Sequence, residues 1–190
     1  ILENCEYAAL IVPATFFGKK KLHKRLWMWD KIDTYLFDDT TKPVGVAYFG
    51  PHKRKDVLYF SNGKRVKLSA DYKGRYTTYN KRDGNLAASL IDTKVRNIKV
   101  MTTEGFNYEK HCHKGARHKV LLRDERIDEA DIDGINAMIE EYRDQTKDFY
   151  LSPFKNLMTC GQYRKRMKFI QLSGIIDEYV KRKNSKLVQK

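Results

Sequence analysis

The 190-residue sequence predicts an α+β fold: an antiparallel sheet of hairpins in the N-terminal two-thirds, packed with two to three C-terminal helices. Two observations lead to this prediction. Short runs of β-branched and aromatic residues, separated by turn-forming residues, fill positions 1–122. Apolar residues spaced by three and four occur in 123–190. Because no repeat or low-complexity linker divides the chain, we expect a single domain over 1–190.

The first strands are expected where short apolar runs end at turn-forming residues. The run 7–12 is closed by Pro13, as in a buried strand. The segments 34–38 and 44–49 alternate apolar and polar residues on either side of a polar turn, which predicts a hairpin.

A second hairpin is expected to join 57–60 to 65–68 through Asn62-Gly63. This dipeptide favours a type I′ turn, because both central positions need a positive φ. Two further segments, 74–79 and 95–102, have the composition of strands.

Residues 19–30 fit two structures. The spacing of Leu22, Leu26 and Trp29 predicts a short amphipathic helix that carries a dense basic cluster. The alternation of Trp27 and Trp29 instead favours a strand. Both alternatives stay open from the sequence.

The helical part is predicted to begin at Asp128, which is a suitable N-cap for a helix from Glu129. Ile132, Ile135 and Ile139 then follow on one face of that helix. A second helix is expected over 154–172, and a third after Ser173-Gly174.

The net charge of +14 is distributed unevenly. Residues 124–148 contain ten acids and three basic residues, a net charge of −7, which leaves +21 on the rest of the chain. A basic body with one acidic helix is typical of a protein that binds a polyanion through one face. We therefore expect nucleic acid as the partner, with an acidic protein as an alternative.

The cations expected to contact phosphates fall into three clusters with tyrosines among them, and tyrosine rings stack on unpaired bases. The expected nucleic-acid-binding residues are Lys19, Lys20, Lys21, Lys24, Arg25, Lys53, Arg54, Lys55, Arg164, Lys165, Arg166 and Lys168. The sequence does not distinguish DNA from RNA. The alternative is that each cluster is an ordinary solvated surface.

No apolar run reaches the roughly 18 residues of a membrane span. The N-terminal residues do not have the pattern of a signal peptide. The three cysteines are odd in number and widely separated, which favours a reducing compartment. We expect an intracellular protein, in a cytoplasm or in a host-cell cytoplasm or nucleoid.

Three of the five histidines lie in 111–118, beside a thiol. His111 and His113 on one side of a strand, with His118 or Cys112, would supply ligands for a divalent metal. His-x-His resembles the metal-binding motif of the HUH nickases, and this resemblance implies Tyr163 as nucleophile. Catalytic candidates are thus His111, His113 and Tyr163, for a metal-dependent nuclease or nickase. The alternative is a basic loop whose histidines only add hydrogen bonds and charge.

A different enzyme class is suggested by 33–50 and 114–117. The first segment is similar to the early hairpin of GNAT-type acetyltransferases. The second, with Gly115, resembles their pyrophosphate loop leading into a helix, here expected over 120–122. The resemblance implies an acyltransferase.

Other catalytic patterns are missing from the sequence, including the P-loop, Cys-x-x-Cys, Gly-x-Ser-x-Gly and His-Glu-x-x-His. The sequence therefore leaves open whether the protein is an enzyme. No cofactor is predicted, apart from a divalent metal in the nuclease alternative. A further alternative is a structural component of a viral or ribonucleoprotein assembly.

Overall fold

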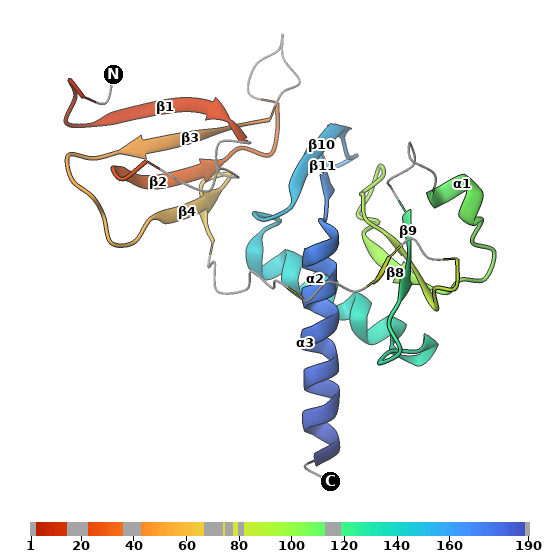
Figure 1. The fold of residues 1–190 in the computed structure, drawn as a ribbon. Coiled ribbons are helices and arrows are strands. Elements are labelled where there is room, and N and C mark those ends of the chain that lie inside the picture. Colours follow the sequence, from red (N-terminus) through yellow and green to blue (C-terminus); the bar gives the residue numbers. More distant parts are fainter. Residues whose placement is uncertain are drawn as a thin grey trace.

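A computed structural model of the chain describes residues 3–14, 23–35, 43–66, 74, 78–79, 82–112 and 119–188. These residues form two larger sheets, one hairpin and two long helices (Figure 1). Antiparallel strands dominate the N-terminal part and the long helices lie towards the C-terminus, so the predicted α+β class is confirmed. None of the described helices is long and apolar enough to cross a membrane.

The N-terminal sheet has five strands in the order β1-β3-β2-β4-β5. Their bounds are β1 Ala8–Pro13, β2 Leu26–Lys31, β3 Val44–Phe49, β4 Leu58–Ser61 and β5 Lys64–Arg65. The neighbouring strands are antiparallel except β2 and β4, which are parallel. Asn62 and Gly63, with φ of 49° and 73°, form the tight turn between β4 and β5, which confirms the predicted second hairpin.

One face of this sheet is the core of the N-terminal part. Alternate residues of each strand point to the same side, and Trp29, Ala47 and Phe49 are buried there together. Phe149, which follows α2 in the chain, is buried in the same cluster. The inner face of the sheet therefore packs against the C-terminal part of the molecule.

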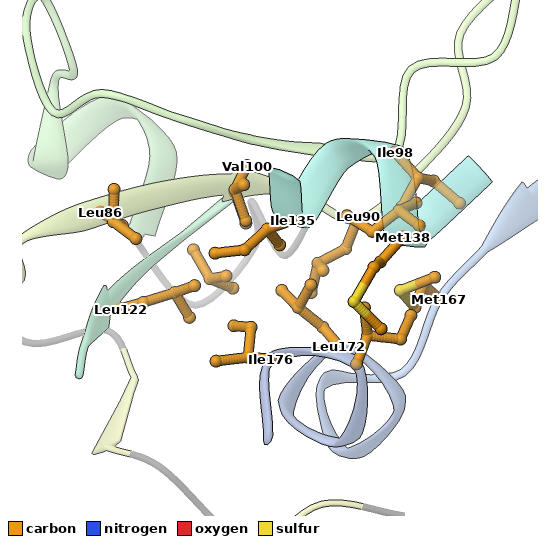
Figure 2. Close-up of a cluster of buried hydrophobic side chains, with 14 of the residues drawn as sticks. Leu86, Leu90, Ile98, Val100, Leu122, Ile135, Met138, Met167, Leu172 and Ile176 are labelled. Atoms are coloured by element: carbon orange, nitrogen blue, oxygen red, sulfur yellow. The ribbon is translucent and has the colours of Figure 1, made fainter. Parts of the chain in front are cut away.

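The second sheet has the order β6-β9-β7-β8. Its strands are β6 Thr78–Tyr79, β7 Leu86–Ser89, β8 Lys99–Met101 and β9 Lys119–Arg123. Helices α2 Ile132–Thr146 and α3 Phe169–Val188 contribute to the same core as this sheet, as Figure 2 shows. The short elements are α1 Tyr108–Cys112, the 3-10 turn η2 Glu129–Asp131, and the hairpin of β10 Ser152–Leu157 with β11 Tyr163–Arg166.

The predicted N-cap is confirmed at the start of η2, which leads directly into α2. The Asp128 side chain accepts from the backbone N–H of Ala130, and the Asp131 side chain accepts from that of Asp128. This reciprocal capping box satisfies backbone donors that the first turn leaves unpaired.

The helix predicted over 154–172 is wrong. Residues 152–166 form the β10–β11 hairpin, with Asn156 (φ 69°) at an irregularity within β10 and Gly161 (φ 78°) in the loop. Helix α3 begins only at Phe169 and continues through Ser173-Gly174 without a break. A Cβ on Gly74 would lie 2.2 Å from the backbone nitrogen of Gly174, so glycine at position 74 permits its chain to approach α3 closely at this dipeptide.

The first predicted hairpin is also placed wrongly. Strand β3 pairs with β2, not with 34–38, of which 36–38 lie outside the described residues. For 26–31 the strand alternative holds, because Leu26, Trp29 and Lys31 are buried with strand-like spacing around a bulge. Strand β8 is shorter than the predicted 95–102; of the predicted 74–79, residues 78 and 79 form β6 and 75–77 lie outside the described residues.

Candidate nucleic-acid interface

Trp27 lies over Gly50 at one end of the N-terminal sheet. Strand β2 bulges between Leu26 and Met28, and this irregularity places the indole beside the chain that follows β3. A Cβ on Gly50 would lie 2.1 Å from the ring, so only glycine leaves room for it. The indole N–H donates to the His52 carbonyl at 2.8 Å. These contacts hold the Trp27 side chain against the β3–β4 connection.

Arg25 holds the same end of the sheet together through hydrogen bonds to backbone carbonyls. Its backbone carbonyl accepts from the N–H of Gly50 at 3.0 Å, and its Nε donates to the Gly50 carbonyl at 2.6 Å. Nη2 donates to the Glu6 carbonyl at 2.6 Å and also reaches the carbonyl of Cys5. Because these donors point at carbonyls, Arg25 joins three chain segments and acts as a positioning residue.

Cations and an exposed aromatic ring surround Trp27. The Arg54 guanidinium carbon lies 5.8 Å from the centre of the indole, a cation–π arrangement. Lys53 and Lys55 flank it and are exposed. Tyr7, 64% exposed, meets Trp27 edge-to-face with ring centres 6.0 Å apart. We call this surface the Trp27 patch; it consists of Tyr7, Trp27, Lys53, Arg54 and Lys55.

The cations of the patch come from the sequence cluster 53–55, and Arg25 of the first cluster lies beside them, bonded to the Gly50 carbonyl. Within the described part of the chain, no carboxylate forms an ion pair with Lys24, Lys53, Arg54 or Lys55. Many other surface arginines are paired: Arg96 with Glu140 at 2.8 Å, for example. The cations of the patch thus keep their positive charge, whereas many other surface arginines are neutralised by carboxylates. Lys19, Lys20 and Lys21 lie outside the described residues.

The third sequence cluster does not join this surface. Arg164 lies over the Phe154 ring at 5.3 Å, and its Nε donates to the Asp92 carbonyl at 2.6 Å. Lys165 was expected to contact phosphates, but its side chain is 0% exposed and is ion-paired with Asp33. This expectation is corrected: alternation along β11 turns Lys165 inwards. Arg166 is half-buried and Lys168 exposed, in β11 and just after it.

Lys165 belongs to a buried charge cluster that sequence reasoning missed. Lys31, on the inner face of β2, donates its ammonium to three carbonyls, those of Asp148, Phe149 and Leu151, at 3.1, 3.3 and 2.9 Å. Burial lowers the pKa of Lys31 to about 8, an effect that Asp33 opposes and Lys165 reinforces. The signal was present in the sequence, because Lys31 follows Trp29 by two residues on the core side.

Arg143 forms the second half of this buried cluster. Its guanidinium binds Asp92 through two hydrogen bonds of 2.9 and 2.8 Å. It binds Asp148 through two more, of 2.8 and 2.9 Å. All three side chains are buried, so the four donors tie the end of α2 to the chain after β7.

The acidic segment is partly neutralised by the protein itself. On α2, Asp144 contacts Arg96 at 3.0 Å, and Glu141 contacts Arg182 of α3 at 3.2 Å. Near η2, Asp131 accepts from Lys183 at 2.8 Å. Several acids of 124–148 therefore bind the protein's own cations, while Glu140, Glu141 and Asp144 of α2 remain accessible to solvent.

Only part of the histidine segment lies within the described residues, and that part is helical. His111 and Cys112 lie in helix α1, not on a strand, and His113 and His118 lie outside the described residues. Among the residues that are described, no three His, Cys, Asp or Glu side chains gather closely enough to hold a metal ion. Burial, together with Lys119 and Lys110, lowers the pKa of His111.

Tyr163, the expected nucleophile, has different surroundings from His111. It is buried in β11, where its ring meets Tyr35 at 5.2 Å, and burial raises the pKa of its hydroxyl. His111 instead packs against Phe106, with ring centres 5.2 Å apart. Of the three candidates, Tyr163 and His111 thus have different ring neighbours, and His113 lies outside the described residues. The helix that the acetyltransferase resemblance implied at 120–122 is not formed, because these residues lie in strand β9.

Comparison of the chain with known protein families, curated proteins and solved structures finds no match. What the protein binds is therefore inferred from its own surface. The Trp27 patch is the place where the described chain brings unpaired cations and aromatic rings together.

Proposed function

We propose that the protein binds nucleic acid through the Trp27 patch. The observation that supports this most is the placement of Arg54 over Trp27, beside Lys53, Lys55 and exposed Tyr7. Lysine and arginine neutralise phosphates and release their counterions, which gives affinity without sequence specificity. Aromatic faces add stacking on bases.

The patch is arranged before any ligand arrives. Trp27 is held by its hydrogen bond to the His52 carbonyl, and its ring fits into the space that Gly50 leaves by lacking a Cβ. Arg25 fixes the adjoining chain segments through backbone carbonyls. A prearranged surface loses less conformational entropy on binding, so more of the interaction energy contributes to affinity.

The cysteines fit the intracellular setting that this proposal implies. Cys5, Cys112 and Cys160 are all free thiols, and two of them are exposed. Exposed thiols persist where the compartment is reducing.

Matched charge reversals test the proposal. Lys53→Glu with Arg54→Glu is expected to weaken binding of labelled DNA or RNA, measured by fluorescence anisotropy, by about tenfold or more at low salt. Lys99→Glu with Lys94→Glu makes the same change of charge at exposed positions near β8 and serves as the control. Equal loss in both pairs would show general electrostatic attraction without a patch. No binding of the wild type to any nucleic acid would contradict the proposal.

A further inference from the structure

The outer face of the N-terminal sheet carries an aromatic row that continues from the Trp27 patch. Ala8 pairs with Phe49 on the inner face, so Tyr7, one residue earlier, points outwards. Trp27 lies over Gly50, which is likewise one residue past Phe49 and therefore on the outer side. Tyr7 and Trp27 thus share the outer face, in agreement with their edge-to-face contact.

The next row of the sheet extends this surface. Tyr48 pairs with Ala9 on one side and with Met28 on the other, and Met28 in turn pairs with Leu58. Residues paired across a sheet place their side chains on the same face. The outer face near the Trp27 patch therefore presents Tyr48 and Met28 beside Tyr7 and Trp27.

This outer face is less buried than the inner one. Along β3 the inner residues Ala47 and Phe49 are buried, whereas Val46 and Tyr48 are half-buried. On β1, Ile11 is 54% exposed. A broad apolar and aromatic sheet face, bordered by Lys53, Arg54 and Lys55, suits a partner with flat apolar rings and negative charge together.

From this arrangement we infer that the outer face binds single-stranded nucleic acid, with unpaired bases lying on Tyr7, Trp27 and Tyr48 and phosphates towards Lys53–Lys55. The inference rests on the proposed nucleic-acid binding and specifies its substrate. A duplex keeps its bases stacked inside and offers only phosphates to such a face, whereas a single strand offers both groups.

A negative charge on the outer face limits where the bound nucleic acid lies. Asp30 is on the outer face, one row beyond Tyr48, paired with Val46 and Phe60. Its carboxylate accepts from the Gly63 N–H at 3.0 and 3.2 Å. A carboxylate repels phosphate, so the bound strand is expected over the Tyr7 end of the face and not over Phe60.

An abasic strand separates stacking from charge. Binding of an oligothymidylate of about 16 nucleotides is compared with an abasic oligonucleotide of the same length and with a duplex. The thymidylate is expected to bind at least about fivefold more tightly than the abasic strand, and more tightly than the duplex. Equal binding of all three would overturn the stacking inference while leaving nucleic-acid binding intact. No binding of any of them would overturn both.

Matched tyrosine variants locate the stacking surface. Tyr7→Leu and Tyr48→Leu are each expected to lower thymidylate affinity severalfold while leaving abasic binding unchanged. Tyr108→Leu is the control. Tyr108 lies under Arg82, as Trp27 lies under Arg54, but it belongs to α1, which is far from this sheet (Figure 1). Thymidylate binding that Tyr7→Leu and Tyr48→Leu leave unchanged would contradict the assignment of the face.

Discussion

Arg54 lies over the ring of Trp27, 5.8 Å from its centre, although the two residues come from different parts of the sheet. Trp27 belongs to β2, and Arg54 to the connection between β3 and β4. Their contact brings the basic cluster 53–55 to the start of β2, which directly follows the basic cluster that ends at Arg25. The convergence of charge, more than the total charge of the chain, is what supports a binding surface here.

Gly50→Ala tests the packing beneath this pair. The added methyl group meets the Trp27 ring, so the indole must move away from its place over the chain. We expect a changed tryptophan emission spectrum and about a five- to tenfold loss of affinity for single-stranded DNA, roughly the contribution of one stacked base. Thermal unfolding should still be cooperative. Unchanged affinity in a folded variant would show that the position of Trp27 does not matter for binding.

Asp30→Asn tests the polarity of the outer face. The asparagine keeps an acceptor for the Gly63 N–H but removes the negative charge. Affinity for single-stranded DNA is expected to rise about two- to threefold at low salt, with a smaller gain at high salt, since exposed charges are screened. Glu104→Gln, on an exposed residue ahead of α1, is the control. Unchanged or weaker binding by Asp30→Asn would contradict the inference that this carboxylate repels the bound nucleic acid from its end of the face.

The lowered pKa of Lys31 implies that the free energy of unfolding depends on pH. Its pKa is about 8 in the folded protein and near 10.5 when unfolded, so between these values the unfolded chain binds more protons. Stability then rises with pH in this window, because deprotonation relieves the cost of the buried charge. Below pH 8 Lys31 is protonated in the folded protein, and the cost of burying its charge is fully present.

Lys31→Met isolates this effect. The free energy of unfolding of the wild type, relative to that of Lys31→Met, is expected to increase from pH 8 to pH 10 in urea titrations. Raised tyrosine pKa values act in the opposite direction near pH 10, but they are common to both proteins and cancel in the difference. A difference that stays constant with pH would mean that Lys31 is charged throughout.

Arg143→Met tests the buried charge cluster. Removing the guanidinium leaves Asp92 and Asp148 buried without their cation, which should destabilise the protein by about 3–5 kcal/mol in urea unfolding. Arg96→Met breaks exposed pairs with Glu140 and Asp144 and should cost no more than about 1 kcal/mol. Similar losses in both variants would contradict a special role for the buried cluster.

The sequence predicted those elements whose signals are local. The Asn62-Gly63 turn and the Asp128 cap depend on residues next to one another, and both are confirmed. The helix predicted over 154–172 failed because its apolar spacing fits a strand equally well. Tyr163 and Lys165 are buried at two-residue spacing in β11, and local propensity could not show that a core lay on that side.

The candidate site was predicted only in part. Lys53, Arg54 and Lys55 were identified from their charge, but their meeting with Trp27 depends on the β2 bulge and on Gly50. Lys165 was predicted to lie on the surface, because residues in a basic run are usually exposed. Its pairing with Asp33, far away in the sequence, is a tertiary contact that charge counting does not reveal.

The most direct test of nucleic-acid binding at the Trp27 patch is the salt dependence of single-strand affinity. Wild-type binding to the thymidylate strand is measured from about 50 to about 200 mM salt. The three cations of the patch predict a slope of about −2 for log K against log[salt], reduced in size by charge reversal at Lys53 and Arg54 but not at Lys99 and Lys94. A flat salt dependence, or a slope that the patch variants leave unchanged, would contradict the account.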